Sequence, residues 1–162
     1  MLNRLVRLSP GSTTLRPLLH RARGVKIGND VFIGDDVYFD EEYPESIELH
    51  DRVQISIRAL LVAHTRGSGR IIIEKEAFVG PHAVIACSAG RVLRIGEGAV
   101  ISAGCVVTRN VPAHAVLTPA PAQITGLAAL PLSIANTMEE FRAGLRPVSS
   151  RGAAVQRKTV DS

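Results

Sequence analysis

The side chain best suited to chemistry in this sequence is the imidazole of His64, which lies in the stretch LLVAHTRGSG. An imidazole has an unperturbed pKa of about 6.5, so it can take a proton from a reacting group near neutral pH, which is typically worth about 10²- to 10⁴-fold in rate. Arg66 and Arg70 flank the loop that follows, and His82 comes later in the chain. We therefore predict that His64 is a general base and that Arg66, Arg70 and His82 bind its substrate.

The two cysteines favour packing over chemistry. Cys87 and Cys105 have neither a zinc-ligand spacing nor a disulfide framework, and no activating partner is adjacent to either thiol. We expect Cys87 to face outward and Cys105 to face inward. The sequence therefore predicts neither a nucleophilic thiol nor a metal site.

A repeat of six residues organises the part of the chain that carries His64. Aliphatic residues or Phe recur every six residues in four stretches, and a small or β-branched residue falls four positions after nearly every one of them. The first set is Ile27, Ile33, Phe39, Leu49, Ile55, Leu61, Ile73, Val79, Ile85, Ile95, Ile101 and Val107. The second set is Val31, Val37, Tyr43, Val53, Ala59, Thr65, Ala77, Ala83, Ala89, Ala99, Cys105 and Val111, in which Tyr43 is the outlier. Two interlocked registers of this kind indicate a solenoid.

Strand alternation gives the repeat its geometry. Residues two apart point to the same face of a strand, as Val31 and Ile33 do on either side of an outward Phe32. Glycine follows the aliphatic residue in several repeats, at Gly28, Gly34, Gly80 and Gly96, and favours a turn there for φ/ψ reasons. Three strands and three turns then make one triangular coil. Four coils are predicted, over 27–44, 49–66, 73–90 and 95–112.

The segments around the coils predict two short helices. Residues 12–23 could form a helix that ends at Gly24, and a second helix begins at Asn136, with Asn136 and Glu139 in capping-box spacing and Gly144 and Pro147 at its end. We therefore divide the chain into a basic segment with a helix (1–24), a β-helix (25–124), a segment with a helix (125–147) and a disordered basic tail (148–162). The fold class is all-β with short terminal helices.

Composition agrees with a narrow, regular core. The chain is 46% hydrophobic but only 4% aromatic, with no Trp, so Ile, Val, Leu and Ala must fill the interior. The net charge of +4 comes from basic residues at both ends, without the aromatic residues or modules of nucleic-acid binding. We expect no nucleic-acid partner, and contact with a membrane surface is open but not indicated. Arginines among the first ten residues argue against a signal peptide, so we expect a cytoplasmic protein.

The stretch from Ile71 to Ile124, together with the repeat, resembles the bacterial hexapeptide-repeat acyltransferases, particularly the O-acetyltransferases of maltose, galactosides and surface polysaccharides. The resemblance implies a left-handed parallel β-helix of about four coils and a homotrimer with active sites between subunits. Three features carry it: His64 before a loop, the trio Phe78-Val79-Gly80, and a closing coil with Ala103-Gly104, Val107-Thr108-Arg109 and Pro112. The residues that it implies for binding the donor, acetyl-CoA, are Phe78, Gly80, Pro81, Ala103, Gly104, Thr108 and Arg109.

The activity implied by this resemblance is direct transfer of an acetyl group to a hydroxyl of a sugar, glycolipid or polysaccharide precursor, with His64 as the base. Backbone N–H groups near Gly80-Pro81 or Ala103-Gly104 could stabilise the oxyanion. The carboxylate that orients His64 is left open among Asp35, Asp36, Asp40 and Glu74. The sequence departs from the family in the loop Pro119-Ala120-Pro121-Ala122, where relatives have Gly-Asn-Pro-Ala, because proline cannot adopt the positive φ that glycine allows.

Two other functions fit the same repeat. A non-catalytic trimeric β-helix could be a scaffold or bind a nucleotide sugar. A metalloenzyme resembling γ-carbonic anhydrases would need His50, His64 and His82 to converge on zinc, but their positions within the repeat differ.

Overall fold

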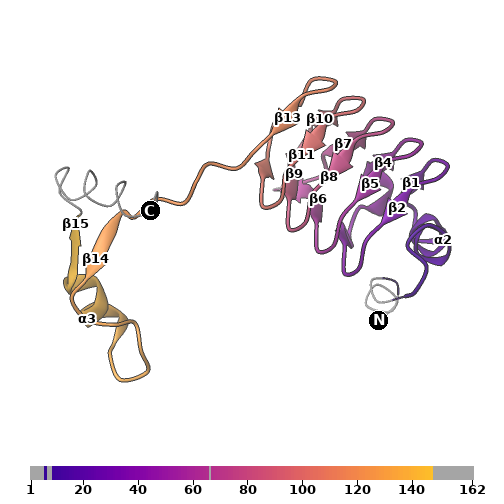
Figure 1. Ribbon diagram of the computed structural model, residues 1–162. Helices are drawn as coiled ribbons and strands as arrows, with labels where there is room; N and C mark the ends of the chain where they lie inside the picture. Colours follow the sequence, from indigo (N-terminus) through magenta and orange to yellow (C-terminus); the bar gives the residue numbers. More distant parts are fainter. Residues whose placement is uncertain (1–5, 7–8, 66, 148–162) are drawn as a thin grey trace. The chain divides into compact units, whose positions relative to one another are not determined.

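The computed structural model describes residue 6 and residues 9–65 and 67–147 of the chain (Figure 1). The predicted tail, 148–162, and Arg66 lie outside the described residues. The chain forms two compact units, Met1–Pro119 and Ala120–Ser162.

Within the described residues, the first unit consists of short strands stacked in three parallel sheets. We name them sheet I (β1-β4-β7-β10), sheet II (β13-β11-β8-β5-β2) and sheet III (β12-β9-β6-β3). Coil one has β1 (Lys26–Ile27), β2 (Phe32–Ile33) and β3 (Tyr38–Phe39); coil two has β4 (Ile47–Leu49), β5 (Gln54–Ile55) and β6 (Leu60–Thr65). Coil three has β7 (Arg70–Ile73), β8 (Phe78–Val79) and β9 (Val84–Ser88); coil four has β10 (Val92–Ile95), β11 (Val100–Ile101) and β12 (Val106–Val107). A partial further coil ends in β13 (Val116–Leu117).

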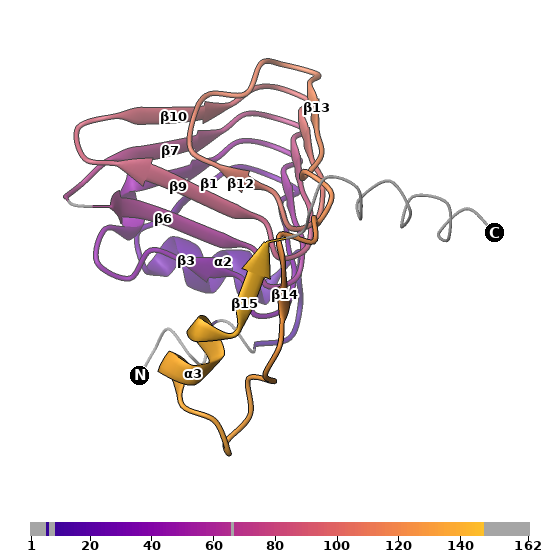
Figure 2. The ribbon, with the colours of Figure 1, turned by 90° about the vertical axis from the view of Figure 1, so that its left-hand side faces the viewer.

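The register of these sheets confirms the six-residue period. Ile33 pairs with Ile55, which pairs with Val79, and Val79 pairs with Ile101, so each aliphatic residue stacks on its equivalent in the next coil. The fold is a parallel β-helix of about four coils, consistent with the left-handed β-helix expected. Viewed roughly along the stack of coils, the sheets surround a central interior (Figure 2), which the buried apolar side chains fill.

The second register holds at nine of its twelve positions and fails at one corner of the coil. The exceptions are Tyr43, which is half-buried, and Thr65 and Ala89, which are exposed. Strands β6 and β9 continue past this corner to Thr65 and Ser88, so alternation turns Ala63 and Cys87 inward instead. The expectation that Cys87 faces outward was therefore wrong, because it is 2% exposed; Cys105 faces inward as predicted.

The glycines that follow the aliphatic residues are explained by close packing and not by φ. Among the described residues, positive φ occurs three positions after the aliphatic residue, as at Asp36, Arg58 and His82, and not at Gly28, Gly34, Gly80 or Gly96. A Cβ added to Gly80 would lie 2.7 Å from both the backbone nitrogen of Ala103 and the carbonyl oxygen of Ile101. The next coil passes too close for any side chain here.

Helix α2 (Leu15–Ala22) lies at the first coil's end of the β-helix (Figure 1). Arg16 is buried and donates hydrogen bonds to the carbonyls of Ile33 and Ser9 and to the carboxylate of Asp35. The helix ends as the sequence predicts, because Gly24 adopts a φ of +108° just beyond the cap.

The second unit contains a two-stranded antiparallel sheet, β14 (Gly126–Ala128) with β15 (Leu145–Pro147), and helix α3 (Met138–Ala143). The capping box of α3 is shifted by one residue from the prediction. Thr137 and Glu140 form it, and the Asn136 side chain donates a hydrogen bond to the carbonyl of Pro131 instead. The C-cap is Gly144, as expected, but Pro147 belongs to β15. Among the described residues, we find no helix with the length and apolar composition needed to cross a membrane.

The packing of Gly80 makes a testable prediction. Gly80→Ala should lower the free energy of unfolding by about 2–3 kcal/mol, because its methyl group would meet the backbone of residues 101–103 in the next coil. Gly90→Ala is the control, since a Cβ there meets nothing within 4 Å and only its φ of +67° adds strain. Urea unfolding of both variants measures the difference, and an equal loss in the two would contradict the close-packing explanation.

Candidate active site

Two neighbouring strands of sheet III place an imidazole against a carboxylate. Asp40 directly follows β3, and His64 lies near the end of β6, which pairs with β3. The Nδ1 atom of His64 is 2.5 Å from Oδ2 of Asp40. The His64 side chain is 36% exposed while that of Asp40 is fully buried. The solvent-accessible imidazole of His64 is thus in contact with a buried carboxylate.

The carboxylate of Asp40 is held by the backbone around it. Its Oδ2 atom accepts the N–H of Ala63 at 2.8 Å, and its Oδ1 atom accepts the N–H groups of Glu42 at 3.0 Å and Tyr43 at 3.2 Å. Both oxygens are therefore occupied, so the carboxylate cannot rotate freely. Of the four carboxylates considered from the sequence, Asp40 is the one that contacts His64. The other three form ion pairs elsewhere: Asp35 with Arg16, Asp36 with Arg58 and Glu74 with Arg94.

The directions of the pKa shifts of His64 and Asp40 fit a base that is held in one orientation. The hydrogen bond to Asp40 raises the pKa of His64 above its ordinary value of 6.5, and the charges of Asp40 and Glu42 add to this effect against a smaller opposing effect of burial. Burial alone would raise the pKa of Asp40, but hydrogen bonds from His64 and from the backbone of Ala63, Tyr43 and Glu42 hold it below its usual value. An ionised carboxylate only accepts hydrogen bonds, so Nδ1 of His64 carries the proton and Nε2 is left to accept one.

Tyr43 is a member of this site that sequence reasoning missed. Its ring centroid lies 6.3 Å from that of His64, in a tilted arrangement, and its backbone N–H contacts Asp40. The signal was present in the sequence, because Tyr43 is the residue too large for the small-residue register. One of the residues that break the period at this corner therefore lies against the imidazole.

The remaining predicted site residues lie at two different corners of the coil. Those at the corner between sheets III and I, where His64 lies, are Thr108 and Arg109, which follow β12. Those at the corner between sheets II and III are Gly80, Pro81 and His82, which follow β8, and Ala103 and Gly104, which follow β11. Phe78 is half-buried on the outer face of β8. A single chain therefore brings only part of the predicted site together.

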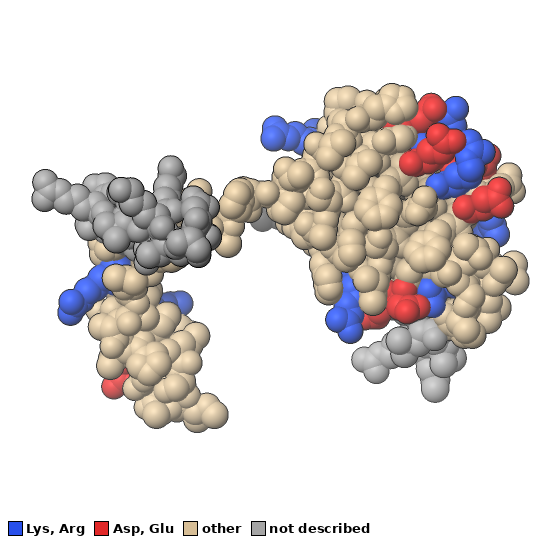
Figure 3. All heavy atoms as spheres, in the orientation of Figure 1, with Lys and Arg blue, Asp and Glu red and all other residues tan. Residues whose placement is uncertain are grey.

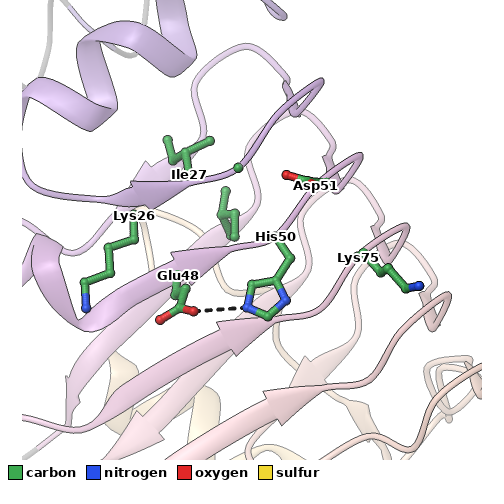
Figure 4. Close-up of a pocket in the computed structure, with 8 residues that line it drawn as sticks. Lys26, Ile27, Glu48, His50, Asp51 and Lys75 are labelled. Carbon is green, nitrogen blue, oxygen red and sulfur yellow. Dashed lines mark hydrogen bonds and ion pairs between the residues drawn. The ribbon is translucent and has the colours of Figure 1, made fainter.

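Arg70 forms an ion pair within the chain, and its contact with a substrate stays a prediction. Its Nη2 atom is 2.5 Å from Oε2 of Glu48, whose other oxygen lies 3.0 Å from Nε2 of His50. This second imidazole–carboxylate pair borders a shallow hollow of about 530 Å³ on the outer face of sheet I (Figure 4). Lys26, Asp51 and Lys75 also line the hollow, and neither His64 nor Asp40 does.

A further hollow lies at the end of the last coil, beside two of the residues predicted to bind the donor. A hollow of about 450 Å³ there is lined by residues 106–112 and Leu117, which include Thr108 and Arg109. Ala103 and Gly104 are exposed, and a Cβ at Gly104 would meet nothing within 4 Å, so a ligand could approach this backbone closely. Gly80 is buried, and packing already explains it; its contact with a donor stays a prediction. Within the described part of the chain, no group of three or more His, Cys, Asp or Glu residues is arranged to hold a metal ion.

One face of the first unit is uncharged. The outward residues of sheet II are Phe32, Gln54, Phe78, Val100 and Val116. Figure 3 shows a broad uncharged surface on this unit, bordered by charged side chains. Phe32 is exposed as predicted, at 38%, whereas Phe78 and Val100 are already half-buried within the chain.

Comparison with known proteins shows which families this sequence is similar to. Residues 70–109 match the family described as hexapeptide repeat of succinyl-transferase. Similar proteins include the 2,3,4,5-tetrahydropyridine-2,6-dicarboxylate N-acetyltransferases of Staphylococcus aureus strains JH9, JH1 and MRSA252. Each is 35% identical over 79 residues, which cover 49% of this chain and 30% of the relative. The chain therefore spans about a third of the length of these relatives. In its six-residue period and its stacked parallel coils, the chain is similar to the hexapeptide-repeat acyltransferases.

Proposed function

We propose that this protein transfers an acetyl group from acetyl-CoA to a hydroxyl of a sugar or polysaccharide precursor, with His64 as the general base. The observation that carries the proposal is the 2.5 Å contact between Nδ1 of His64 and the buried carboxylate of Asp40. A carboxylate on one ring nitrogen fixes the tautomer and the ring orientation, and it stabilises the imidazolium that forms when the other nitrogen takes a proton. The arrangement suits removal of a proton from an alcohol.

The acetyl group passes directly from the thioester of acetyl-CoA to the acceptor hydroxyl. The acceptor oxygen attacks the thioester carbonyl carbon while Nε2 of His64 takes the hydroxyl proton, so a C–O bond forms. The C–S bond then breaks, and the CoA sulfur leaves with a proton returned from the imidazolium. Neither cysteine is suited to an acyl-enzyme, because Cys87 and Cys105 are both buried.

The positions of the predicted donor-binding residues support a homotrimer as the active form. Thr108 and Arg109 share a corner with His64, whereas Pro81, Ala103 and Gly104 lie at another corner, so a site that used both sets would form between copies of the chain. The uncharged outer face of sheet II is suited to such an interface, since charged residues are depleted at the centres of interfaces. The free thiols of both cysteines suit the reducing cytoplasm, which is the compartment we propose.

A second acceptor class has specific support. The relatives are named N-acetyltransferases of a tetrahydropyridine dicarboxylate, so their acceptor is a nitrogen. The same base could take the proton that an attacking amine must lose. A panel of sugar and amine acceptors assayed with the same acetyl-CoA separates the two classes.

Binding of the donor is the first prediction, and it distinguishes an enzyme from a scaffold. Calorimetric titration with acetyl-CoA should give a saturable signal with one site per chain. Arg109→Ala should weaken binding by about tenfold, the value of one charged contact with a phosphate. Arg91→Ala, an exposed arginine at the same corner one coil earlier, is the matched control. Absence of heat with acetyl-CoA would favour the scaffold instead.

Removal of the base is the second prediction. His64→Ala should lower kcat by about 10²- to 10⁴-fold, because general-base assistance is lost, while the Kd for acetyl-CoA stays nearly unchanged. His82→Ala, which changes an exposed imidazole at the other corner, should keep kcat within about tenfold of the wild type. Steady-state kinetics and calorimetry together measure this. Equal loss of turnover and of donor affinity in His64→Ala would assign the residue to donor binding.

The pH dependence of kcat is the third prediction. Only neutral His64 is a base, and its pKa is raised, so activity should rise with pH through a value above 6.5. Asp40→Asn removes the charge that favours the imidazolium, so the rise should move to lower pH while the plateau falls because the ring loses its orientation. Asp51→Asn, a carboxylate outside the pair, should leave the profile unchanged. A profile that stays in place in Asp40→Asn would contradict this role of Asp40.

A further inference from the structure

Helix α2 reaches the residues that hold His64, although it lies at the end of the β-helix. The guanidinium of Arg23, just after the helix, donates a hydrogen bond from Nη2 to the backbone carbonyl of Asp40 at 3.3 Å. His20, one turn earlier, packs edge-on against Phe39 with ring centroids 4.5 Å apart. The helix therefore contacts two successive residues at the point where the chain leaves β3.

Arg23 is itself held by a buried histidine. Its Nη1 atom lies 3.2 Å from Nδ1 of His20, which is fully buried. Burial, and then the charges of Arg23 and Arg16, lower the pKa of His20 to about 3, so the ring is neutral. Arginine only donates, so Nδ1 of His20 accepts and the ring proton is on Nε2. That Nε2 atom is buried, and no described residue of the chain forms a hydrogen bond with it.

A buried unpaired N–H group is costly, and such a group in a native protein calls for an explanation. An apolar residue would fill this position without that cost, but it would offer Arg23 no acceptor. The contact that requires the imidazole is its Nδ1 acceptor, placed to receive Arg23. We read the arrangement as one that fixes the direction of the guanidinium.

Both backbone polar groups of Asp40 are therefore hydrogen-bonded. Its N–H donates to the carbonyl of Leu61 at 3.0 Å within sheet III, and its carbonyl accepts from Arg23. Beyond Asp40 the chain turns out of the sheet, and the N–H groups of Glu42 and Tyr43 fold back onto the carboxylate. The direction of the carboxylate thus depends on where this backbone carbonyl is held.

We propose that Arg23, braced by His20, is a positioning residue that holds Asp40 in the orientation needed to bind His64. The proposal rests on the proposed function for its catalytic consequence, but the contact between Asp40 and His64 can be measured without any substrate. The charged groups that face His64 are Asp40 and Glu42. Those that face Arg23 are Glu41 and Asp40, and the titratable phenol of Tyr38 also faces it.

The test is an NMR titration of the His64 ring in the full chain, assigned by comparison with His64→Ala. In Arg23→Ala, loss of a positive charge by itself would raise the pKa of His64, whereas loosening of Asp40 would lower it toward 6.5. We expect the pKa to fall, and kcat to fall by about tenfold, the order of one hydrogen bond to a charged group. Arg23→Gln keeps a hydrogen-bond donor but cannot bridge His20 and Asp40, so it should also lower the pKa of His64. If the alanine variant does not fold, the glutamine variant tests the role of Arg23 in its place.

Arg21→Ala is the matched control, because Arg21 is on the same helix and also donates to backbone carbonyls of the first coil, those of Ile27 and Gly28. It should leave the pKa of His64 and kcat unchanged. An unchanged or raised pKa in the Arg23 variants would overturn the proposal, as would an equal fall in Arg21→Ala. If no acceptor is acetylated by the wild type, the proposed function fails while the titration still decides the role of Arg23.

Discussion

The close approach of one coil to the next is the constraint on which this structure depends. Parallel strands in a ladder lie about 4.8 Å apart, so each coil must present its backbone to the coil above and below with no side chain between them. At Gly80 this close approach excludes even a methyl group. The interior is then filled by aliphatic residues stacked in register, and the rows of buried Ile, Val, Leu and Ala follow from that stacking.

A fold so regular can form a functional site only where its regularity is interrupted. At the corner between sheets III and I, β6 and β9 continue to Thr65 and Ser88, and the small-residue register fails at Tyr43, Thr65 and Ala89. Asp40 is buried there because four donors, including the imidazole of His64, replace the water that the carboxylate gives up. The site and the defect in the repeat are therefore the same feature.

The ends of the β-helix raise a different problem, because a terminal coil has one uncovered side. Helix α2 covers the first coil, and it does so with polar side chains, Arg16 and His20, which are both buried. Arg16 satisfies carbonyls that no earlier coil could pair, such as that of Ile33. The same cap, through Arg23, reaches the residue that holds His64, so stability at this end and geometry at the site share one helix.

The amino-acid sequence by itself determined the parallel β-helix, because two registers of period six leave the chain little choice of fold, and it singled out His64 by its place before a long loop. It also located both terminal helices, although the cap of α3 was displaced from Asn136 to Thr137. The sequence could not choose Asp40 over three other carboxylates, because that choice depends on the pairing of β3 with β6 across 24 residues of chain. Nor could it foresee that Cys87 turns inward or that Gly80 is required by a neighbour's backbone. Those facts arise from contacts between coils, which exist only once the chain is stacked on itself.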